Sequence, residues 1–302
     1  MGDNIKILRK LAQKGAEEYY GTPIPQEVND RLEYEFGLLT PVMADMMLDA
    51  RQNFSYLQKM GYVLSRGISS IVMFCIGASN TDPIKFGLLS ENFDWGAERL
   101  LYVYRPIEGT PNVDLRKLPL DNEAVFDILK RGETDKVYIP DNDVVNPRLR
   151  DFQPNNFSEL SIFFALLKPG LEARLKTTRQ QPDTFAGSDL PEVKSILKDT
   201  FGVRVYQEQD MQIAQAIGGF SREESADFRR AILKNNEEKL SEYKMMFFQR
   251  ASVAGYDAES IAGIWNEWES SGRRPVSKSY ITDLALITYA KVWQRVHEQE
   301  KQ

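Results

Sequence analysis

Helical spacing of apolar residues, interrupted by clear stop signals, is the feature of this sequence that most constrains its fold. From residue 192 onward the chain reads almost wholly as helix. Ser221 and Glu224 stand in the Ser-x-x-Glu pattern of a capping box, which predicts a helix from that point through Lys234. Further helices are predicted at 237–254, 257–270 and 279–299.

The N-terminal part shows the same periodicity. Ile5, Leu8 and Ala12 share one face of a predicted helix over 4–20, which ends at a Gly-Thr-Pro-Ile-Pro segment. Other predicted helices are 26–36, 41–60, 71–77, 122–130 and 159–167. The best strand is the aromatic and β-branched run 99–106, which ends at a proline. We therefore expect a mainly α fold, of the α+β type with a small sheet.

Composition is that of a soluble globular protein. The 302 residues, 42% hydrophobic and 27% charged, are ample for one large domain or two modest ones. No apolar run approaches the roughly 18 residues that span a bilayer, and the N-terminus lacks the layout of a signal peptide. We expect a cytoplasmic protein with no membrane partner.

The inventory of reactive side chains is narrow. The chain has one cysteine, Cys75, inside an apolar run, and one histidine, His297, in its charged tail. An internal disulfide is therefore excluded, and we expect neither a catalytic dyad nor a zinc site, because both would need clusters of Cys and His. Any catalysis would depend on carboxylates. Asp141 and Asp143 stand two apart, as metal-binding carboxylates often do, but a Pro-Asp-Asn-Asp turn explains them better.

The net charge of −6 argues against a protein that coats nucleic acid by bulk electrostatics. A local basic groove stays compatible with it. Basic residues cluster at Arg229, Arg230 and Lys234, at Arg273, Arg274 and Lys278, and at Arg174, Lys176 and Arg179. For each cluster alone, a solvated surface is the commoner explanation.

Two blocks of motifs, in the expected order, resemble the bacterial replicative DNA polymerase III alpha subunit. The first block, 5–93, has Gly67 and Ser70 in a nucleotide loop and then Thr81-Asp82-Pro83 and Phe86-Gly87-Leu88-Leu89. The second block, 112–297, contains Ala165-Leu166-Leu167-Lys168-Pro169-Gly170, Tyr206-Gln207-Glu208-Gln209, Arg229-Arg230 and Ser277-Lys278-Ser279. The resemblance implies a truncated palm-like region over 1–111 and a helical fingers-like domain over 112–302.

The resemblance also implies a loss of catalytic parts. In the family, two strands with three catalytic aspartates and the thumb lie between these blocks, whereas here residues 94–111 join them. Nucleotidyl transfer needs two divalent ions held by carboxylates on rigid strands. We therefore expect no catalytic residue, no metal site and no cofactor.

Residues expected to contact DNA or nucleotide follow from the same resemblance. They are Arg66, Gly67, Ser69, Ser70, Lys168, Arg229, Arg230, Lys234 and Lys278. In the loop, Ile68 stands where small residues would let the backbone approach a phosphate, and a Ser-Ser helix cap is an equally good explanation of Ser69 and Ser70. Arg229 and Arg230 match basic residues that face the triphosphate in the family. They are also explained as helix surface, or as partners of Asp227 and Glu223.

Two interpretations remain open. The first is a polymerase III alpha-like protein without catalysis that binds DNA, a nucleotide or replication proteins. The alternative is an active, metal-dependent DNA polymerase or nucleotidyltransferase, in which carboxylates in 94–114, or Asp141 and Asp143, rebuild a Mg²⁺ site.

Overall fold

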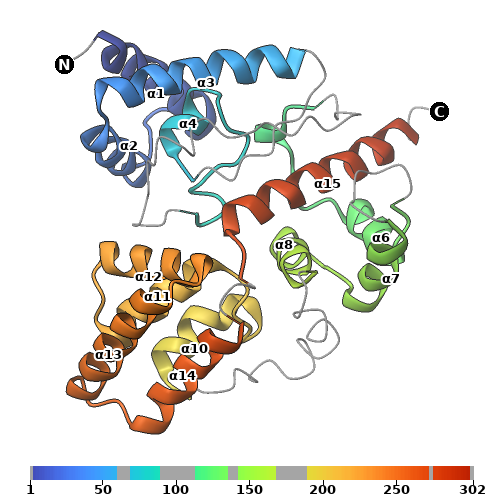
Figure 1. The fold of residues 1–302 in the computed structure, drawn as a ribbon. Helices are drawn as coiled ribbons and strands as arrows, with labels where there is room; N and C mark the ends of the chain where they lie inside the picture. Colours follow the sequence, from blue (N-terminus) through green and yellow to red (C-terminus); the bar gives the residue numbers. More distant parts are fainter. Residues whose placement is uncertain are drawn as a thin grey trace. The chain divides into compact units, whose positions relative to one another are not determined.

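The computed structural model describes residues 3–59, 69–88, 113–134, 142–167, 189–271 and 275–299. Within these ranges the chain is mainly helical, as expected (Figure 1). The small sheet is not supported there, because β-pairing in the described ranges amounts to one isolated parallel bridge between Tyr206 and Val276. The predicted strand 99–106 lies outside the described residues.

The helices begin and end close to the predicted positions. Their bounds are α1 Asp3–Tyr20, α2 Gln26–Leu38, α3 Pro41–Lys59, α4 Ile71–Cys75, α6 Glu123–Arg131, α7 Asn142–Phe152, α8 Phe157–Leu166, α10 Pro191–Leu197, α11 Gln207–Gly218, α12 Arg222–Lys234, α13 Glu237–Val253, α14 Ala258–Ser271 and α15 Lys278–Gln299. Short 3₁₀ turns cover η1 Leu115–Lys117 and η2 Lys198–Thr200. None of the helices in the described part of the chain combines the length and apolar character needed to cross a bilayer.

The end of the predicted Pro-Asp-Asn-Asp turn belongs to a helix. Helix α7 starts at Asn142 and continues past Pro147, with Asp143 in its first turn. The sequence predicted a Pro-Asp-Asn-Asp turn at 140–143 and assigned no helix to the residues that follow it. The structure corrects that reading for Asp143, whereas Asp141 lies outside the described residues.

The chain divides into two compact units. Unit 1 contains residues 1–150, 155–157 and 279–302, and unit 2 contains 151–154 and 158–278. This division differs from the predicted boundary at 111/112, mainly because α15 returns to the N-terminal unit. The boundary between palm-like and fingers-like regions stays a prediction.

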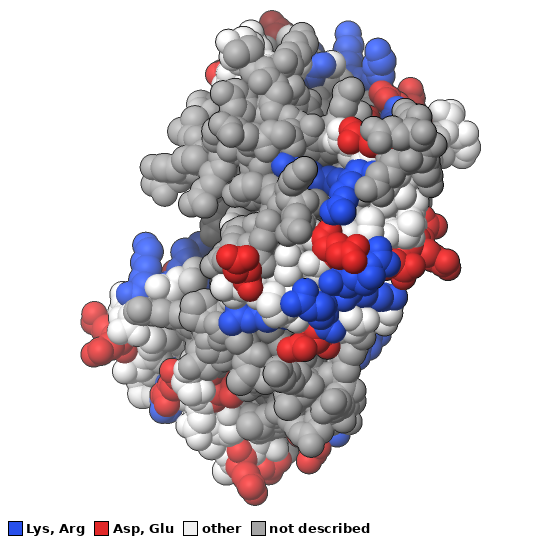
Figure 2. All heavy atoms as spheres, turned by 90° about the vertical axis from the view of Figure 1, so that its right-hand side faces the viewer, with Lys and Arg blue, Asp and Glu red and all other residues white. Residues whose placement is uncertain are grey.

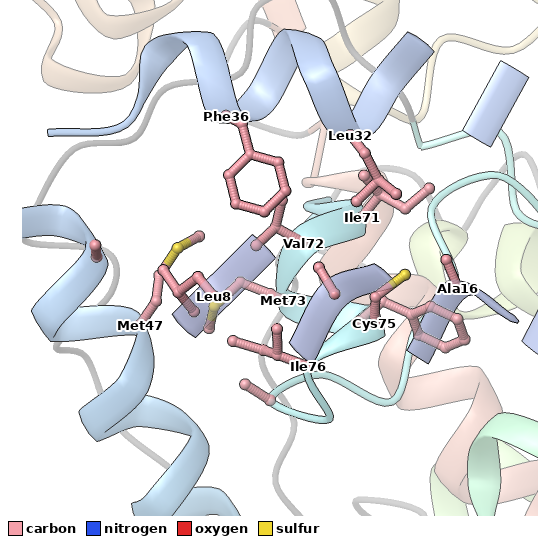
Figure 3. Close-up of a cluster of buried hydrophobic side chains, with 14 of the residues drawn as sticks. Leu8, Ala16, Leu32, Phe36, Met47, Ile71, Val72, Met73, Cys75 and Ile76 are labelled. Carbon is pink, nitrogen blue, oxygen red and sulfur yellow. The ribbon is translucent and has the colours of Figure 1, made fainter. Parts of the chain in front are cut away.

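The core of unit 1 is built around the short helix α4, whose residues are all buried (Figure 3). Leu8 and Ala16 of α1, Leu32 and Phe36 of α2 and Met47 of α3 belong to the same cluster as α4. Helix α1 comes so close to α4 that a Cβ added to Gly15 would lie 1.8 Å from the carbonyl oxygen of Cys75. The sequence therefore needs a glycine at this position.

Unit 2 has a core of aromatic residues. Phe220, Phe228, Phe247, Trp265 and Trp268 pack mostly edge to face, for example Phe228 and Trp268 with ring centroids 4.9 Å apart. Trp265 and Trp268 are both buried in this core. Helix α12 begins at the predicted capping box, in which Ser221 and Glu224 each bond to the other's backbone N–H. This core fixes the positions of α11, α12, α13 and α14, which carry much of the candidate site.

Candidate functional site

The residues expected to contact DNA or nucleotide lie in different units. Arg66, Gly67 and Lys168 are outside the described residues. Ser69 and Ser70 precede α4 in unit 1. The other four, Arg229, Arg230, Lys234 and Lys278, belong to unit 2.

An internal carboxylate lies at the start of α4. Ser70 is the N-cap: its Oγ accepts a hydrogen bond from the Met73 N–H at 3.1 Å, and its hydroxyl donates to Glu35 Oε2 at 2.7 Å. The N–H groups of Ile71 and Val72 also donate to Glu35, each at 3.1 Å. Such N–H groups are the ones that would bind a phosphate. Glu35 therefore occupies the place that an anionic ligand would need.

Glu35 is held in place by its own helix. It follows Arg31 by one turn of α2, and Arg31 Nε lies 2.9 Å from Glu35 Oε1, with side-chain exposures of 10% and 0%. Burial raises the pKa of Glu35, while the bonds from Ser70 and the Arg31 charge act in the opposite direction. Every hydrogen-bond partner named for Glu35 is a donor, which is what an ionised carboxylate requires. The capping explanation is thereby confirmed for Ser70.

A second buried carboxylate, Asp210 of α11, joins two arginines. Arg204, shortly before α11, pairs with Oδ1, and Arg229 of α12 pairs with Oδ2 at 3.1 Å. Trp268 Nε1 of α14 donates to Oδ1 at 3.2 Å. The side chains of Arg204, Asp210 and Arg229 are 1%, 0% and 4% exposed. One carboxylate thus ties α11, α12 and α14 together.

The guanidinium of Arg229 faces the protein interior. Its Nη2 also donates to the carbonyl of Pro275 at 3.2 Å, which ties α12 to the segment before α15. Burial lowers the pKa of Arg229, and the neighbouring Asp210 raises it. Arginine stays charged in proteins, so the site holds a buried cation paired with a carboxylate.

Arg230 and Lys234 are on the solvent-exposed side of α12. The side chain of Arg230 is 46% exposed, and its Nη2 lies 3.4 Å from Asp227 Oδ1. Asp227 also binds Lys239 Nζ at 2.6 Å and accepts a bond from the Tyr243 hydroxyl at 3.0 Å. Asp227 is therefore a partner of Arg230, as one reading of the sequence proposed. The structure does not bring Arg229 and Arg230 together on one exposed face.

Lys278 begins α15, and its backbone is bound by Glu208 of α11. The Lys278 N–H lies 3.1 and 3.0 Å from the two Glu208 oxygens. Its ammonium lies 5.8 Å from the ring centroid of Tyr206. Burial lowers the pKa of Lys278, and Glu208 raises it. Hydrogen bonds between Val205, Gln207 and Val276 attach this segment to the start of α11.

Carboxylates that could rebuild a metal site are not gathered in the described part of the chain. No three His, Cys, Asp or Glu side chains there come together as metal ligands. Asp114 pairs with Arg116 at 3.2 Å, and Asp143 is exposed on α7. Most of 94–114 and Asp141 lie outside the described residues, so the alternative with relocated carboxylates stays a prediction.

Two family models match the chain. The bacterial DNA polymerase III alpha subunit finger domain matches residues 101–255, just over half of the chain, and the bacterial DNA polymerase III alpha NTPase domain matches 6–99. The chain belongs to the bacterial DNA polymerase III alpha subunit family. The resemblance inferred from the sequence motifs is confirmed.

Curated polymerase III alpha subunits are similar over part of the chain. The subunit from Pasteurella multocida is 32% identical over 199 residues, 63% of this chain and 17% of the relative. The Aquifex aeolicus subunit is 30% identical over 190 residues, 62% of this chain and 16% of the relative. The Staphylococcus epidermidis subunit is 29% identical over 224 residues, 72% of this chain and 21% of the relative. The matched part is about a fifth or less of each of these polymerase III alpha subunits.

The sequence analysis of this polymerase III alpha family chain did not identify three site residues, Glu35, Arg204 and Asp210. Glu35 lies within the NTPase match, and Arg204 and Asp210 lie within the finger match. Glu35 falls between the buried Leu32 and Phe36 on α2, and Asp210 precedes the buried Ile213 and Ala214 on α11. An acid at a core position of an amphipathic helix was the available signal. Nothing comparable marks Arg204.

Proposed function

We propose that this polymerase III alpha family chain does not synthesise DNA and acts as a binding protein in DNA replication or repair. We propose DNA as its main partner. A nucleotide and a replication protein are the alternative partners. The observation that carries the proposal is that internal carboxylates, Glu35 and Asp210, engage two groups that the family resemblance assigns to phosphate. A cytoplasmic location goes with this function, because that is where a bacterial replication protein meets DNA.

Electrostatic repulsion supports the proposal that this chain does not bind a nucleoside triphosphate for synthesis. A triphosphate placed at the start of α4 would meet the Glu35 carboxylate, which already accepts the Ile71 and Val72 N–H groups. Like charges in a buried site repel strongly, and Glu35 could leave only by giving up Arg31 as well. Similarly, Arg229 could reach a ligand only by leaving Asp210. Both groups are better suited to holding the fold than to holding a substrate.

The arrangement of the matched segments also supports the proposal. The NTPase match ends at residue 99 and the finger match begins at residue 101. The family's strands with catalytic aspartates and its thumb have no counterpart between the two blocks of motifs. Without those carboxylates the two-metal centre that nucleotidyl transfer requires has no ligands. No metal or cofactor is therefore part of the proposed function.

DNA binding is the retained activity that we propose. Arg230 and Lys234 are exposed on one helix of the finger match, and an exposed guanidinium or ammonium binds a phosphate without needing a catalytic centre. Their contacts with DNA would be made to the backbone, so binding would show little dependence on base sequence. It would weaken as salt rises, because phosphate contacts release counterions.

Primer extension with Mg²⁺ and with Mn²⁺, alongside duplex binding by fluorescence anisotropy, tests the proposal. We expect no extension, and binding that falls steeply between low and physiological salt. Extension by the wild-type protein would overturn the proposal and favour the alternative, an active polymerase with a relocated Mg²⁺ site. Binding that is absent, or flat across salt, would argue against DNA and direct the search to replication proteins.

Variants distinguish the proposed DNA contact of Arg230 from the structural role of Arg229. Arg230→Ala with Lys234→Ala should weaken duplex binding without changing stability much, because both side chains are exposed. Arg229→Ala should instead destabilise the fold by about 3 kcal/mol or more, because it leaves Asp210 with one arginine fewer in a buried site. Urea denaturation of both variants measures this contrast. An Arg229→Ala protein of unchanged stability that fails to bind DNA would show that Arg229 is a ligand contact after all.

A further inference from the structure

The basic side chains of helix α13 are all engaged by neighbouring helices of unit 2. Helix α13 packs against α11, α12 and α14 (Figure 1). Each of its bases pairs with an acid of α12 or α14: Lys239 with Asp227 at 2.6 Å, Lys244 with Glu269 at 2.8 Å, and Arg250 with Glu224 at 2.7 Å. These bases therefore belong to the contacts that hold the helix in place.

The acids of α13 have no such partners. Glu237, Glu238 and Glu242 are exposed, and in the part of the chain that the structure describes none of their carboxylates makes a hydrogen bond or an ion pair. Glu237 and Glu238 lie in the first turn, where the helix dipole favours an acid, whereas Glu242 lies beyond it. On the face drawn in Figure 2, by contrast, acids lie beside lysines and arginines. The N-terminal half of α13 therefore presents unpaired negative charge to solvent.

The C-terminal half of the same side of α13 is apolar. Met245 follows Glu242 by three residues and Glu238 by seven, so the three share one side of the helix. Met245 is 67% exposed, and Val253, about two turns further on, is 84% exposed. Arg250, the one charged residue of the sequence between them, is the base that pairs with α12. The exposed side of α13 thus changes from acidic to apolar along its length.

We propose that this outer strip, formed by Glu238, Glu242, Met245 and Val253, binds a basic amphipathic helix of another protein. Such a helix sets lysines or arginines against the two acids and apolar side chains against Met245 and Val253. It runs antiparallel to α13, because its cations then lie at its own C-terminal end, where the helix dipole favours them. At 1.5 Å per residue the strip is about 22 Å long, which matches about four turns of a bound helix.

Charge separates this partner from two others. The phosphates of DNA would be repelled by Glu238 and Glu242. A second copy of the chain fits no better: parallel α13 helices would set acids against acids, and antiparallel ones would set acids against Met245 and Val253. In both arrangements a carboxylate loses water without gaining a cation. The inference therefore adds a protein partner to the proposed DNA binding and does not depend on that binding.

Fluorescence anisotropy of a labelled synthetic peptide, titrated with the whole chain, tests the proposal. The probe is a capped helical peptide of about 18 residues, with leucines on one face of its N-terminal half and lysines on the same face of its C-terminal half. A matched probe has glutamate in place of each lysine. We expect the lysine probe to bind and the glutamate probe to bind at least about tenfold more weakly, because it meets acids with acids.

Two variants divide the outer strip into its acidic and apolar halves. Glu238→Gln with Glu242→Gln should weaken binding of the lysine probe about fivefold and make it less sensitive to salt. Met245→Ala with Val253→Ala should weaken it by a similar factor, about fivefold, and leave the salt dependence unchanged. All four side chains are exposed, so both variants should fold, which thermal unfolding checks.

The control variant is Glu27→Gln with Glu123→Gln, which removes two exposed acids from the first turns of α2 and α6 and should bind the lysine probe like wild type. A lysine probe that does not bind the wild-type chain would overturn the proposal, and so would equal weakening in the control. Sedimentation velocity adds one more outcome. A wild-type dimer that Met245→Ala with Val253→Ala dissociates would assign the strip to a second copy and sink the proposal.

Discussion

Glu35 and Asp210 are acids at core positions of their helices, and both are held by donors from more than one element. Burying a carboxylate is costly, and that cost is offset only while its partners remain in place. Such a residue therefore adds little net stability compared with an apolar side chain of similar size. Removing its charge, however, leaves several donors without an acceptor.

Glu35→Gln should destabilise the protein by about 3 kcal/mol. The amide keeps the size of the side chain but presents an NH₂ group to donors, and it leaves Arg31 without a carboxylate. Urea denaturation followed by circular dichroism measures the loss. The control is Glu33→Gln on the same helix, 67% exposed, which should cost at most about 1 kcal/mol. Equal losses in the two variants would contradict this role for Glu35.

For single residues, the sequence identified candidates for the site but did not predict which side chains they contact. The capping role of Ser70 was predictable because a cap depends on neighbours a few residues away. The pairing of Arg229 with Asp210 was not, because it depends on how α11 and α12 pack through Phe228 and Ile213. A pair of adjacent arginines on a helix points in two directions about 100° apart, so one of them can be buried while the other is exposed.

Between elements, Glu224 joins the start of α12 to α13. Its two oxygens accept bonds from Arg250 Nη1 and Nη2 at 2.7 and 2.9 Å, and it also closes the capping box with Ser221. The Arg250 bonds, followed by the Ser221 backbone N–H, hold the pKa of Glu224 below its ordinary value near 4.5. Ionised Glu224 therefore stabilises the folded state above that pH, and the stabilisation is lost as pH falls through the lowered value.

Glu224→Gln should accordingly reduce stability at neutral pH by about 0.5–1 kcal/mol, a modest amount because both partners are partly exposed. The difference from wild type should shrink as pH falls below 4.5 and the wild-type carboxyl becomes protonated. Thermal unfolding at several pH values follows it, with Glu242→Gln, an exposed acid of α13, as the control. If the stability difference between Glu224→Gln and wild type persisted at acidic pH, the cause would be packing and not the charge of Glu224.

Helix positions were predictable from the sequence because caps and apolar spacing act within one or two turns. Ser221 caps α12 as predicted, and Asn122, the first residue of the predicted helix 122–130, is the N-cap of α6. Helix α7 was not predicted; it contains Pro147, and proline at an interior position usually argues against a helix. The return of α15 to unit 1, through the bond from the Asn122 N–H to the Tyr289 hydroxyl at 3.0 Å, depends on contacts 167 residues apart. Local patterns carry no information about such contacts.

Across the whole molecule, each compact unit has a core of its own. A change that opens the core of unit 1 should therefore leave that of unit 2 protected. Gly15→Ala is such a change, because its Cβ would overlap the Cys75 carbonyl and separate α1 from α4. Hydrogen exchange should show α1 and α4 losing protection while α11 and α13 keep theirs.

Gly37→Ala is the matched control for this experiment. A Cβ at Gly37 in α2 meets no heavy atom within 4 Å, so alanine there should stabilise the helix by about 0.5–1 kcal/mol. Exchange that increased throughout unit 2 in the Gly15 variant would show that the two cores unfold together.

The sole cysteine of the chain also lies where α1 meets α4. Burial raises the pKa of the Cys75 thiol, so in the closed core it is both shielded and protonated, and it should react slowly with alkylating reagents. A thiol-reactive dye would then label the protein only as fast as α1 lifts from α4. The rate of colour development would report the opening of the N-terminal core in an unmodified sample, with no competing signal from another sulfhydryl.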